Sequence, residues 1–255
     1  MTNVKVADMS RVEFDARPTN TPILIPVGAL EQHGPHLPLD TDQAIANAFA
    51  IDLAESVGAV VAPGIGYGCR SHPVSGGGEF FRATTSLSGS VMSDIMFDLI
   101  RAFRGNGFHN FAFINGHFEN AAFLVESAHR AVEAMPGLKI LVVNWWELAQ
   151  ADYLSEIFDG NFPGWEAEHA GIVETSLMMH IAPERVRDKL IEERISDVRA
   201  PAYTVVPERA GLVDPTGVLR TAWGSSARIG SGIYVHCLEE MAAVLRSEFP
   251  GGDQP

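Results

Sequence analysis

Two short motifs place a histidine and a glutamate at matched spacing. EQH at residues 31–33 directly follows an apolar run at residues 21–30, and HFE at residues 117–119 follows a second run at residues 110–114. Side chains two positions apart on extended backbone point to the same side, so each motif presents an imidazole and a carboxylate together. Open α/β sheets bind ligands at the carboxyl ends of parallel strands, so the two motifs are expected to converge there.

Asp42 adds a further carboxylate at the start of a segment with helical spacing. A carboxylate there could bridge two cations while the helix end holds it, although Asp40 competes for this role. Together with the four His and Glu residues of the motifs, Asp42 gives a ligand set without thiolates, which suits a pair of Zn²⁺ or Mn²⁺ ions with open positions. Water between two such ions becomes a nucleophile near neutral pH, so the set predicts hydrolysis.

The elements that must position these residues follow from apolar periodicity and from Gly and Pro boundaries. Strands are predicted at residues 21–30, 59–62, 110–114 and 139–143, and helices at 41–56, 88–104, 120–134, 170–181 and 231–249. Such alternation predicts an α/β fold of three layers, with a mostly parallel sheet and helices on both faces. Residues 63–85 form a long glycine-rich loop, residues 151–164 have loop character, and short strands are expected within 194–224.

The composition is that of a folded globular chain. The 255 residues include 46% hydrophobic and 20% charged residues and lack a clear linker, so one domain over residues 1–255 is expected, with a loose tail at 250–255. A formal charge of -14 opposes binding to nucleic acid or to anionic membranes. Cys69 and Cys237 are expected to be free thiols. No signal peptide or membrane span is recognised, so a cytoplasmic location is expected.

Four stretches of the sequence resemble one known family. They are IPVGALEQHG at 25–34, PHLPLDTD at 35–42, NGHFEN at 115–120 and EHAGIVETS at 168–176. The chain resembles the creatininase family of amidohydrolases over most of residues 20–185 and weakly beyond. This resemblance implies two divalent ions per chain (Zn²⁺ and/or Mn²⁺), a homohexamer, and reversible hydrolysis of a small cyclic amide, creatinine, to creatine.

The resemblance also implies roles for the candidate ligands. One metal would take Glu31, Asp42 and His117, and the other His33, Asp42 and Glu119. Asp42 is then the bridge, because the family pattern places the ligand at the second aspartate of PHLPLDTD.

His169 is implied to be the general acid/base that moves the proton to the leaving nitrogen, with Glu119 also among the catalytic residues. The acids that flank His169, Glu168 and Glu174, could orient its imidazole or raise its pKa. The expected second layer of the site therefore includes Glu174.

Substrate contacts are implied for Ser75, Phe118, Trp146, Trp165 and Glu166. Trp165 follows Pro and Gly and suits a lid that stacks on a flat ring and excludes water, with Trp146 lining the other side. Phe118 stands where creatininase itself has Tyr, and Glu166 where Asp is expected. These departures could change selectivity among small amides by about 1–3 kcal/mol.

Two alternatives remain open at the level of sequence. The chain could be another amidase of the family, such as a formamide hydrolase or a peptidase of cofactor maturation. It could instead be a metal-stabilised binding protein without turnover. His169 favours an enzyme, because a purely structural metal site needs no proton shuttle and leaves no coordination position open.

Overall fold

A four-stranded parallel sheet forms the centre of the computed structural model, which describes residues 3–195, 198, 200–209 and 211–250. The strand order is β2-β1-β3-β4. The strands are β1 (Ile23–Val27), β2 (Val60–Val61), β3 (Asn110–Asn115) and β4 (Lys139–Asn144). The predicted parallel sheet and its four strand positions are thus confirmed, with β1 shorter than the apolar run that contains it.

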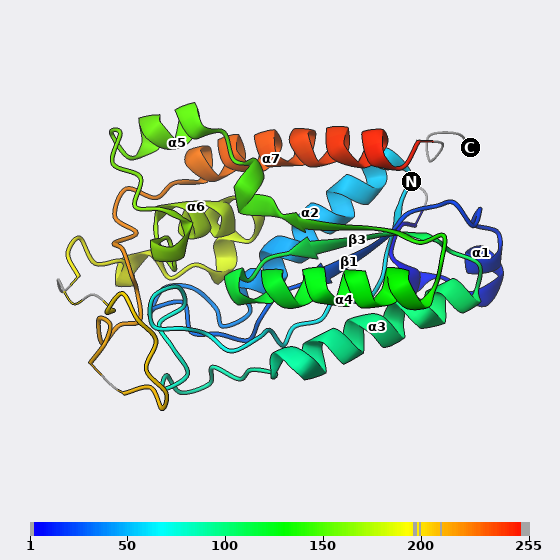
Figure 1. Ribbon diagram of the computed structural model, residues 1–255. Coiled ribbons are helices and arrows are strands. Elements are labelled where there is room, and N and C mark those ends of the chain that lie inside the picture. Colours follow the sequence, from blue (N-terminus) through cyan, green and yellow to red (C-terminus); the bar gives the residue numbers. More distant parts are fainter. Residues whose placement is uncertain (1–2, 196–197, 199, 210, 251–255) are drawn as a thin grey trace.

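Helices cover both faces of the sheet and make the three predicted layers (Figure 1). The α-helices are α1 (Arg11–Asp15), α2 (Thr41–Val57), α3 (Gly89–Gly105), α4 (Ala121–Ala134), α5 (Ala151–Ile157), α6 (Ile172–Ile181) and α7 (Ala227–Glu248). The short 3₁₀ helices are η1 (Val6–Asp8), η2 (Phe118–Asn120), η3 (Trp145–Leu148), η4 (Trp165–Ala167), η5 (Pro183–Arg185) and η6 (Asp188–Leu190).

Alternate residues of the buried strands supply two separate cores. Ile23, Ile25 and Val27 of β1 pack in the core that includes α3 and α4. Leu24 points the other way, into the core shared by α2, α6 and α7. Both faces of β1 are fully buried, which explains its continuous apolar sequence.

Residues 151–157 form helix α5 where a loop was expected. Leu154 is buried in the core on the α7 side, and Tyr153 lies so close to α7 that a Cβ at Gly232 would be 2.4 Å from the Tyr153 hydroxyl. The helix is therefore stabilised by packing against α7, which the local sequence does not reveal.

The strands expected within 194–224 are not found among the described residues of this segment, which form turns and bends. Its prolines cannot donate to a strand ladder, and its glycines weaken one. Of the expected tail, residues 251–255 lie outside the described part of the chain. No helix of the described residues is long and apolar enough to cross a membrane.

Candidate binuclear metal centre and active site

The two motifs converge because β1 and β3 are neighbours in the sheet. Val27 at the end of β1 pairs with Asn115 at the end of β3, so the chain after each strand emerges at the same edge. Glu31, His33 and His117 are each at most 2% exposed there. The convergence predicted from strand polarity is confirmed.

Asp42 lies between the two histidines. Its Oδ1 is 2.9 Å from Nε2 of His33, and its Oδ2 is 2.9 Å from Nδ1 of His117. Asp42 belongs to the first turn of α2, where the helix dipole favours a carboxylate. Asp40 forms an ion pair with Arg185 instead. Asp42 is thus the aspartate that faces both histidines.

Each histidine directs one ring nitrogen to a backbone carbonyl. Nδ1 of His33 lies 3.1 Å from the carbonyl oxygen of Glu31, and Nε2 of His117 lies 3.0 Å from that of Cys69. If these nitrogens carry the protons, Nε2 of His33 and Nδ1 of His117 present lone pairs toward Asp42. Histidines that bind metals are typically held in this way.

Two groups of side chains that share Asp42 could each hold a cation. One consists of Glu31, Asp42 and His117, and the other of His33, Asp42 and Glu174; in each group the ligand atoms lie within 4.8 Å of one another. Glu174 reaches the second group from α6, where its Oε2 is 3.8 Å from Nε2 of His33. A third combination joins Glu31 and His33 with His169.

Glu119 lies elsewhere than the resemblance implied. Its Oε2 is 3.2 Å from Nε2 of His117, the nitrogen on the far side of the ring from Asp42. Its Oε1 accepts hydrogen bonds from the Ser75 hydroxyl at 2.5 Å and from the His72 amide at 3.0 Å. Among the described residues, Glu174 therefore occupies the place beside His33 and Asp42 that was expected for Glu119.

The buried polar atoms of the site fit a pair of divalent cations. Oε1 of Glu31 is buried without a hydrogen-bond partner, which is costly unless another ligand satisfies it, and Nε2 of His33 has the Asp42 carboxylate beside it at 2.9 Å. The donors are imidazoles and carboxylates, the set that Zn²⁺ and Mn²⁺ accept. A cation bound between these side chains would supply the partner that Oε1 of Glu31 lacks within the described part of the chain.

The charges of the buried side chains also favour a bound cation. Burial alone would lower the pKa of His33. The negative charges of Asp42, Glu174 and Glu31 have the larger effect and raise the pKa of His33 to about 10. Burial likewise opposes ionisation of Asp42, yet His33 and His117 hold the pKa of Asp42 below its usual range. The carboxylate cluster therefore requires positive charge, which the imidazoles supply when no cation does.

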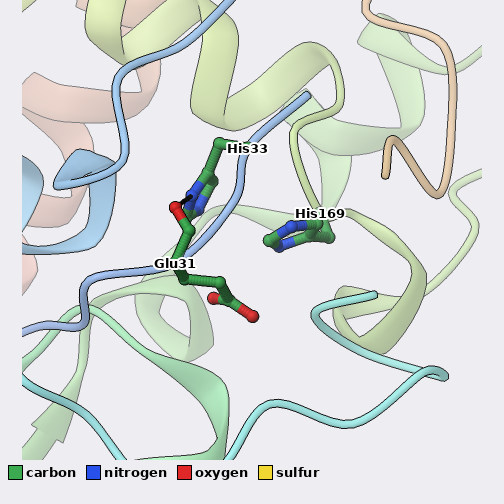
Figure 2. Close-up of side chains that lie close together, drawn as sticks. All are labelled: Glu31, His33 and His169. Atoms are coloured by element: carbon green, nitrogen blue, oxygen red, sulfur yellow. Dashed lines mark hydrogen bonds between the residues drawn. The ribbon is translucent and has the colours of Figure 1, made fainter. Parts of the chain in front are cut away.

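His169 lies between η4 and α6, with its ring centroid 4.4 Å from that of His33 (Figure 2). Its Nε2 is 2.8 Å from the carbonyl oxygen of Gln32. Burial lowers the pKa of His169 to about 4, so the ring is neutral near pH 7 and can accept a proton. A neutral ring that donates from Nε2 to Gln32 keeps Nδ1 as its proton acceptor.

Glu168 and Glu174 do not hydrogen-bond to His169 in this arrangement. Oε1 of Glu168 accepts from the Val173 amide at 2.9 Å, and Oε2 of Glu174 accepts from the Ala170 amide at 2.6 Å. Both carboxylates thus hold the start of α6, where free backbone amides are available. Gln32 is the residue for which a hydrogen bond to the His169 imidazole is found in the described part of the chain.

Gln32 was not singled out in the sequence, although it is the middle residue of EQH. Its Oε1 accepts from the Gly34 amide at 3.0 Å, and its Nε2 donates to the carbonyl oxygens of Gly76 and Gly217 at 3.0 and 2.9 Å. These backbone partners fix the orientation of the side-chain amide. Gln32 therefore joins three loops beside His169.

The glycine-rich loop approaches these side chains rather than open space. A Cβ at Gly76 would lie 2.0 Å from Oε1 of Glu31. Outside this loop, a Cβ at Gly217 would lie 1.8 Å from Oε1 of Gln32. These contacts show close backbone approach to the residues of the candidate metal centre and to Gln32 beside His169.

Two asparagines of NGHFEN also support the site and were missed. Asn115 accepts a hydrogen bond from the His117 amide at 3.1 Å. Asn120 accepts from the Cys69 amide at 2.8 Å and donates to the Gly28 carbonyl at 3.1 Å. They fix the backbone on both sides of His117, and their position within the quoted motif was the available signal.

A pocket of about 30 Å³ opens beside the ligands, and the expected substrate residues Ser75, Phe118, Trp146 and Trp165 line it. Phe118 stacks on Trp146 with ring centroids 5.9 Å apart. Trp165 packs edge-on against Trp145 at 5.7 Å. Glu166 does not line this pocket; it is exposed and faces adjoining grooves.

A family model described as creatinine amidohydrolase matches residues 7–245. The chain belongs to the creatininase family. It is thus a hydrolase that acts on amide C–N bonds. It is 32% identical to the creatinine amidohydrolase of Pseudomonas putida, over 97% of this chain and 98% of that protein. A mycofactocin precursor peptide peptidase of Mycolicibacterium smegmatis is 31% identical over 86% of this chain and 82% of its own length.

Solved creatininase structures share the whole fold. One crystal structure of a creatininase superposes with a TM-score of 0.94 at 31% identity, covering 98% of this chain and 99% of that one. A mutant creatininase complexed with creatine gives a TM-score of 0.93 at 32% identity, covering 97% and 99%. Other creatininase structures are described as a Zn-Zn type and as an Mn form.

Proposed function

We propose that this chain hydrolyses a small cyclic amide. The leading candidate substrate is creatinine, the product is then the open-chain creatine, and the reaction is reversible. The observation that carries the proposal is the pair of ligand groups that share Asp42 and border the same small pocket as His169. The similarity to creatinine amidohydrolase over nearly the full length of both chains supports creatinine as substrate.

Two divalent cations, Zn²⁺ or Mn²⁺, are proposed as cofactors. Glu31, Asp42 and His117 would hold one ion, and His33, Asp42 and Glu174 the other, because the ligand atoms converge in both groups and the two groups share Asp42. Glu119 is the alternative ligand from the family resemblance. When bound, such ions polarise an amide carbonyl and acidify water, which is the chemistry that hydrolysis at neutral pH requires.

His169 is proposed as the general acid/base. In amide hydrolysis the attacking water loses a proton, its oxygen bonds to the carbonyl carbon, the C–N bond breaks, and the ring nitrogen gains a proton. His169 is neutral near pH 7 and lies beside Glu31 and His33, so its Nδ1 can accept the proton from water and return it to the nitrogen.

The aromatic walls would select a flat, small ring. Phe118, Trp146 and Trp165 line the pocket beside the ligands, so a bound ring would contact aromatic faces on several sides. Closure of Trp165 over the ring would exclude water from the reacting carbonyl. Ser75 is proposed as a polar contact at the mouth of the pocket.

Metal analysis of protein purified without chelator, followed by assays on creatinine, creatine and a panel of formamides and hydantoin-like lactams, tests the proposal. About two divalent ions per chain and conversion of creatinine in both directions are expected. Turnover of a formamide without any turnover of creatinine would reject the substrate and keep the amidohydrolase chemistry. Light scattering would test the expected assembly of six copies.

A second candidate function is hydrolysis of a larger amide, as in the mycofactocin peptidase relatives. The observation that favours it is a groove that continues from the small pocket across exposed apolar side chains. The same substrate panel separates the two candidates when it includes one short peptide.

A further inference from the structure

A broad groove adjoins the catalytic pocket. Its volume is about 580 Å³, against about 30 Å³ for the pocket itself. The two spaces share Ser75, Phe118, Glu119 and Trp146 as lining residues. A molecule held by its reacting amide in the pocket can therefore extend past Phe118 and Trp146 into the groove.

Exposed apolar side chains line much of this groove. Phe118, Phe123 and Val74 are 37%, 39% and 46% exposed. Phe123 lies directly over the start of α3, since a Cβ at Gly89 would be 1.9 Å from its ring. The small side chains of Ala121 and Ala122 add to the lining. Apolar surface of this kind beside a catalytic pocket is typical of a site for a ligand group.

The charges in the groove limit what that group can be. Glu147 and Glu166 present exposed carboxylates to it. Arg70 also lines the groove, and within the described residues its guanidinium makes neither an ion pair nor a hydrogen bond. Carboxylates next to aromatic faces attract cationic groups and repel anionic ones.

We infer that the groove binds the substituent of an amide substrate larger than creatinine, namely an apolar group of aromatic size that is neutral or positively charged. This inference rests on the proposed amidohydrolase function and extends its substrate class. Creatinine alone would leave the groove empty, whereas ligand sites of a few hundred Å³ are ordinarily filled by the ligand.

The test compares N-benzylformamide with N-methylformamide on the metal-loaded enzyme. The substitution Ala122→Trp fills the groove, and Val125→Trp is its control, since Val125 is exposed on the same helix but does not line the groove. We expect kcat/KM for the benzyl amide to exceed that for the methyl amide by about tenfold and to lose this advantage only in Ala122→Trp. Equal values for the two amides in the wild type would overturn the inference.

Charge is tested with two benzyl formamides that carry a para-aminomethyl or a para-carboxylate group. The aminomethyl compound should be hydrolysed at least as well as the neutral parent, and the carboxylate compound more slowly. Faster hydrolysis of the carboxylate compound would overturn the stated ligand class, because Arg70 would then determine which charge the groove accepts.

Equilibrium binding keeps the inference separate from the proposed function. If no amide is turned over, calorimetry of N-benzylformamide with the metal-loaded wild type and with Ala122→Trp still decides: weaker binding in Ala122→Trp supports the groove, and equal binding rejects it. Light scattering of the wild type and of Ala122→Trp tests whether a second copy of the chain occupies the groove instead. If Ala122→Trp changes the number of associated copies and leaves ligand binding unchanged, the groove is an interface between copies and the inference is wrong.

Discussion

Oδ2 of Asp42 lies 2.9 Å from Nδ1 of His117, although 75 positions separate the two residues in the chain. The contact depends on Gly116, where a Cβ would lie 2.3 Å from the carbonyl oxygen of Asp42. The loop that carries His117 therefore passes directly against the first turn of α2. This close approach gives Asp42 access to His33 and His117 at the same time.

Replacing Asp42 should empty or scramble both metal positions, because both ligand groups share its carboxylate. We expect Asp42→Ala to lose nearly all bound metal, as measured by elemental analysis. Asp40→Ala is the matched control, since Asp40 pairs with Arg185. Full metal content in Asp42→Ala together with metal loss in Asp40→Ala would show that the bridging residue is Asp40.

Glu174 and Glu119 should differ in their effect on the metal. Glu174→Ala should lose about one of two ions per chain, because it removes a carboxylate from the group with His33 and Asp42. Glu119→Ala should keep both ions and lower turnover, because Glu119 contacts Ser75 and the far side of His117. The opposite result in elemental analysis would restore Glu119 as the ligand that the family resemblance implied.

His169→Ala should keep both ions and lose about 10² to 10⁴ in turnover of creatinine, as expected for a missing general acid/base. Steady-state kinetics and metal analysis on the same preparation check this. Near-normal turnover would limit His169 to a structural role. Loss of metal would instead support the combination of His169 with Glu31 and His33 as a ligand group.

Trp165→Ala should impair creatinine hydrolysis and leave metal content and the fold intact, because Trp165 lines the pocket without belonging to any ligand group of the described residues. Trp165→Phe should recover part of the activity, since it keeps an aromatic face for stacking. Kinetics on creatinine and on one open-chain formamide separate the substrate classes. Indifference of creatinine turnover to both substitutions would remove the lid role.

Gly76→Ala should destabilise the chain by about 1–3 kcal/mol and weaken metal retention, because no room exists for a side chain at this site. The new Cβ would lie 2.0 Å from Oε1 of Glu31. Gly105→Ala is the control, since no atom lies within 4 Å of a Cβ there and alanine favours the helix. Denaturant unfolding measures the free energy of unfolding of both variants. If Gly76→Ala were as stable as the wild type, the loop would be able to move away from Glu31.

The sequence by itself determined the sheet and the convergence of the two motifs. Apolar runs bounded by Gly and Pro located the four strands, and parallel polarity then required that residues after β1 and β3 meet at one edge. The spacing of apolar residues within each segment likewise predicted four helices, α2, α3, α4 and α6, within about two residues of their bounds. The motif residues also identified the family, because their identities are specific and contiguous in the chain.

Only the tertiary structure decided which side chains meet across long separations. Glu174 reaches His33 through the placement of α6, and Gln32 reaches His169 across 137 positions, a contact that no local pattern encodes. Helix α5 is weak in its own sequence and is stabilised by packing on α7. The groove beside Phe118 arises where α4 and the segments that carry Val74 and Trp146 come together. Local propensity and strand polarity act over a few residues or one sheet edge, whereas these contacts depend on how separate elements pack.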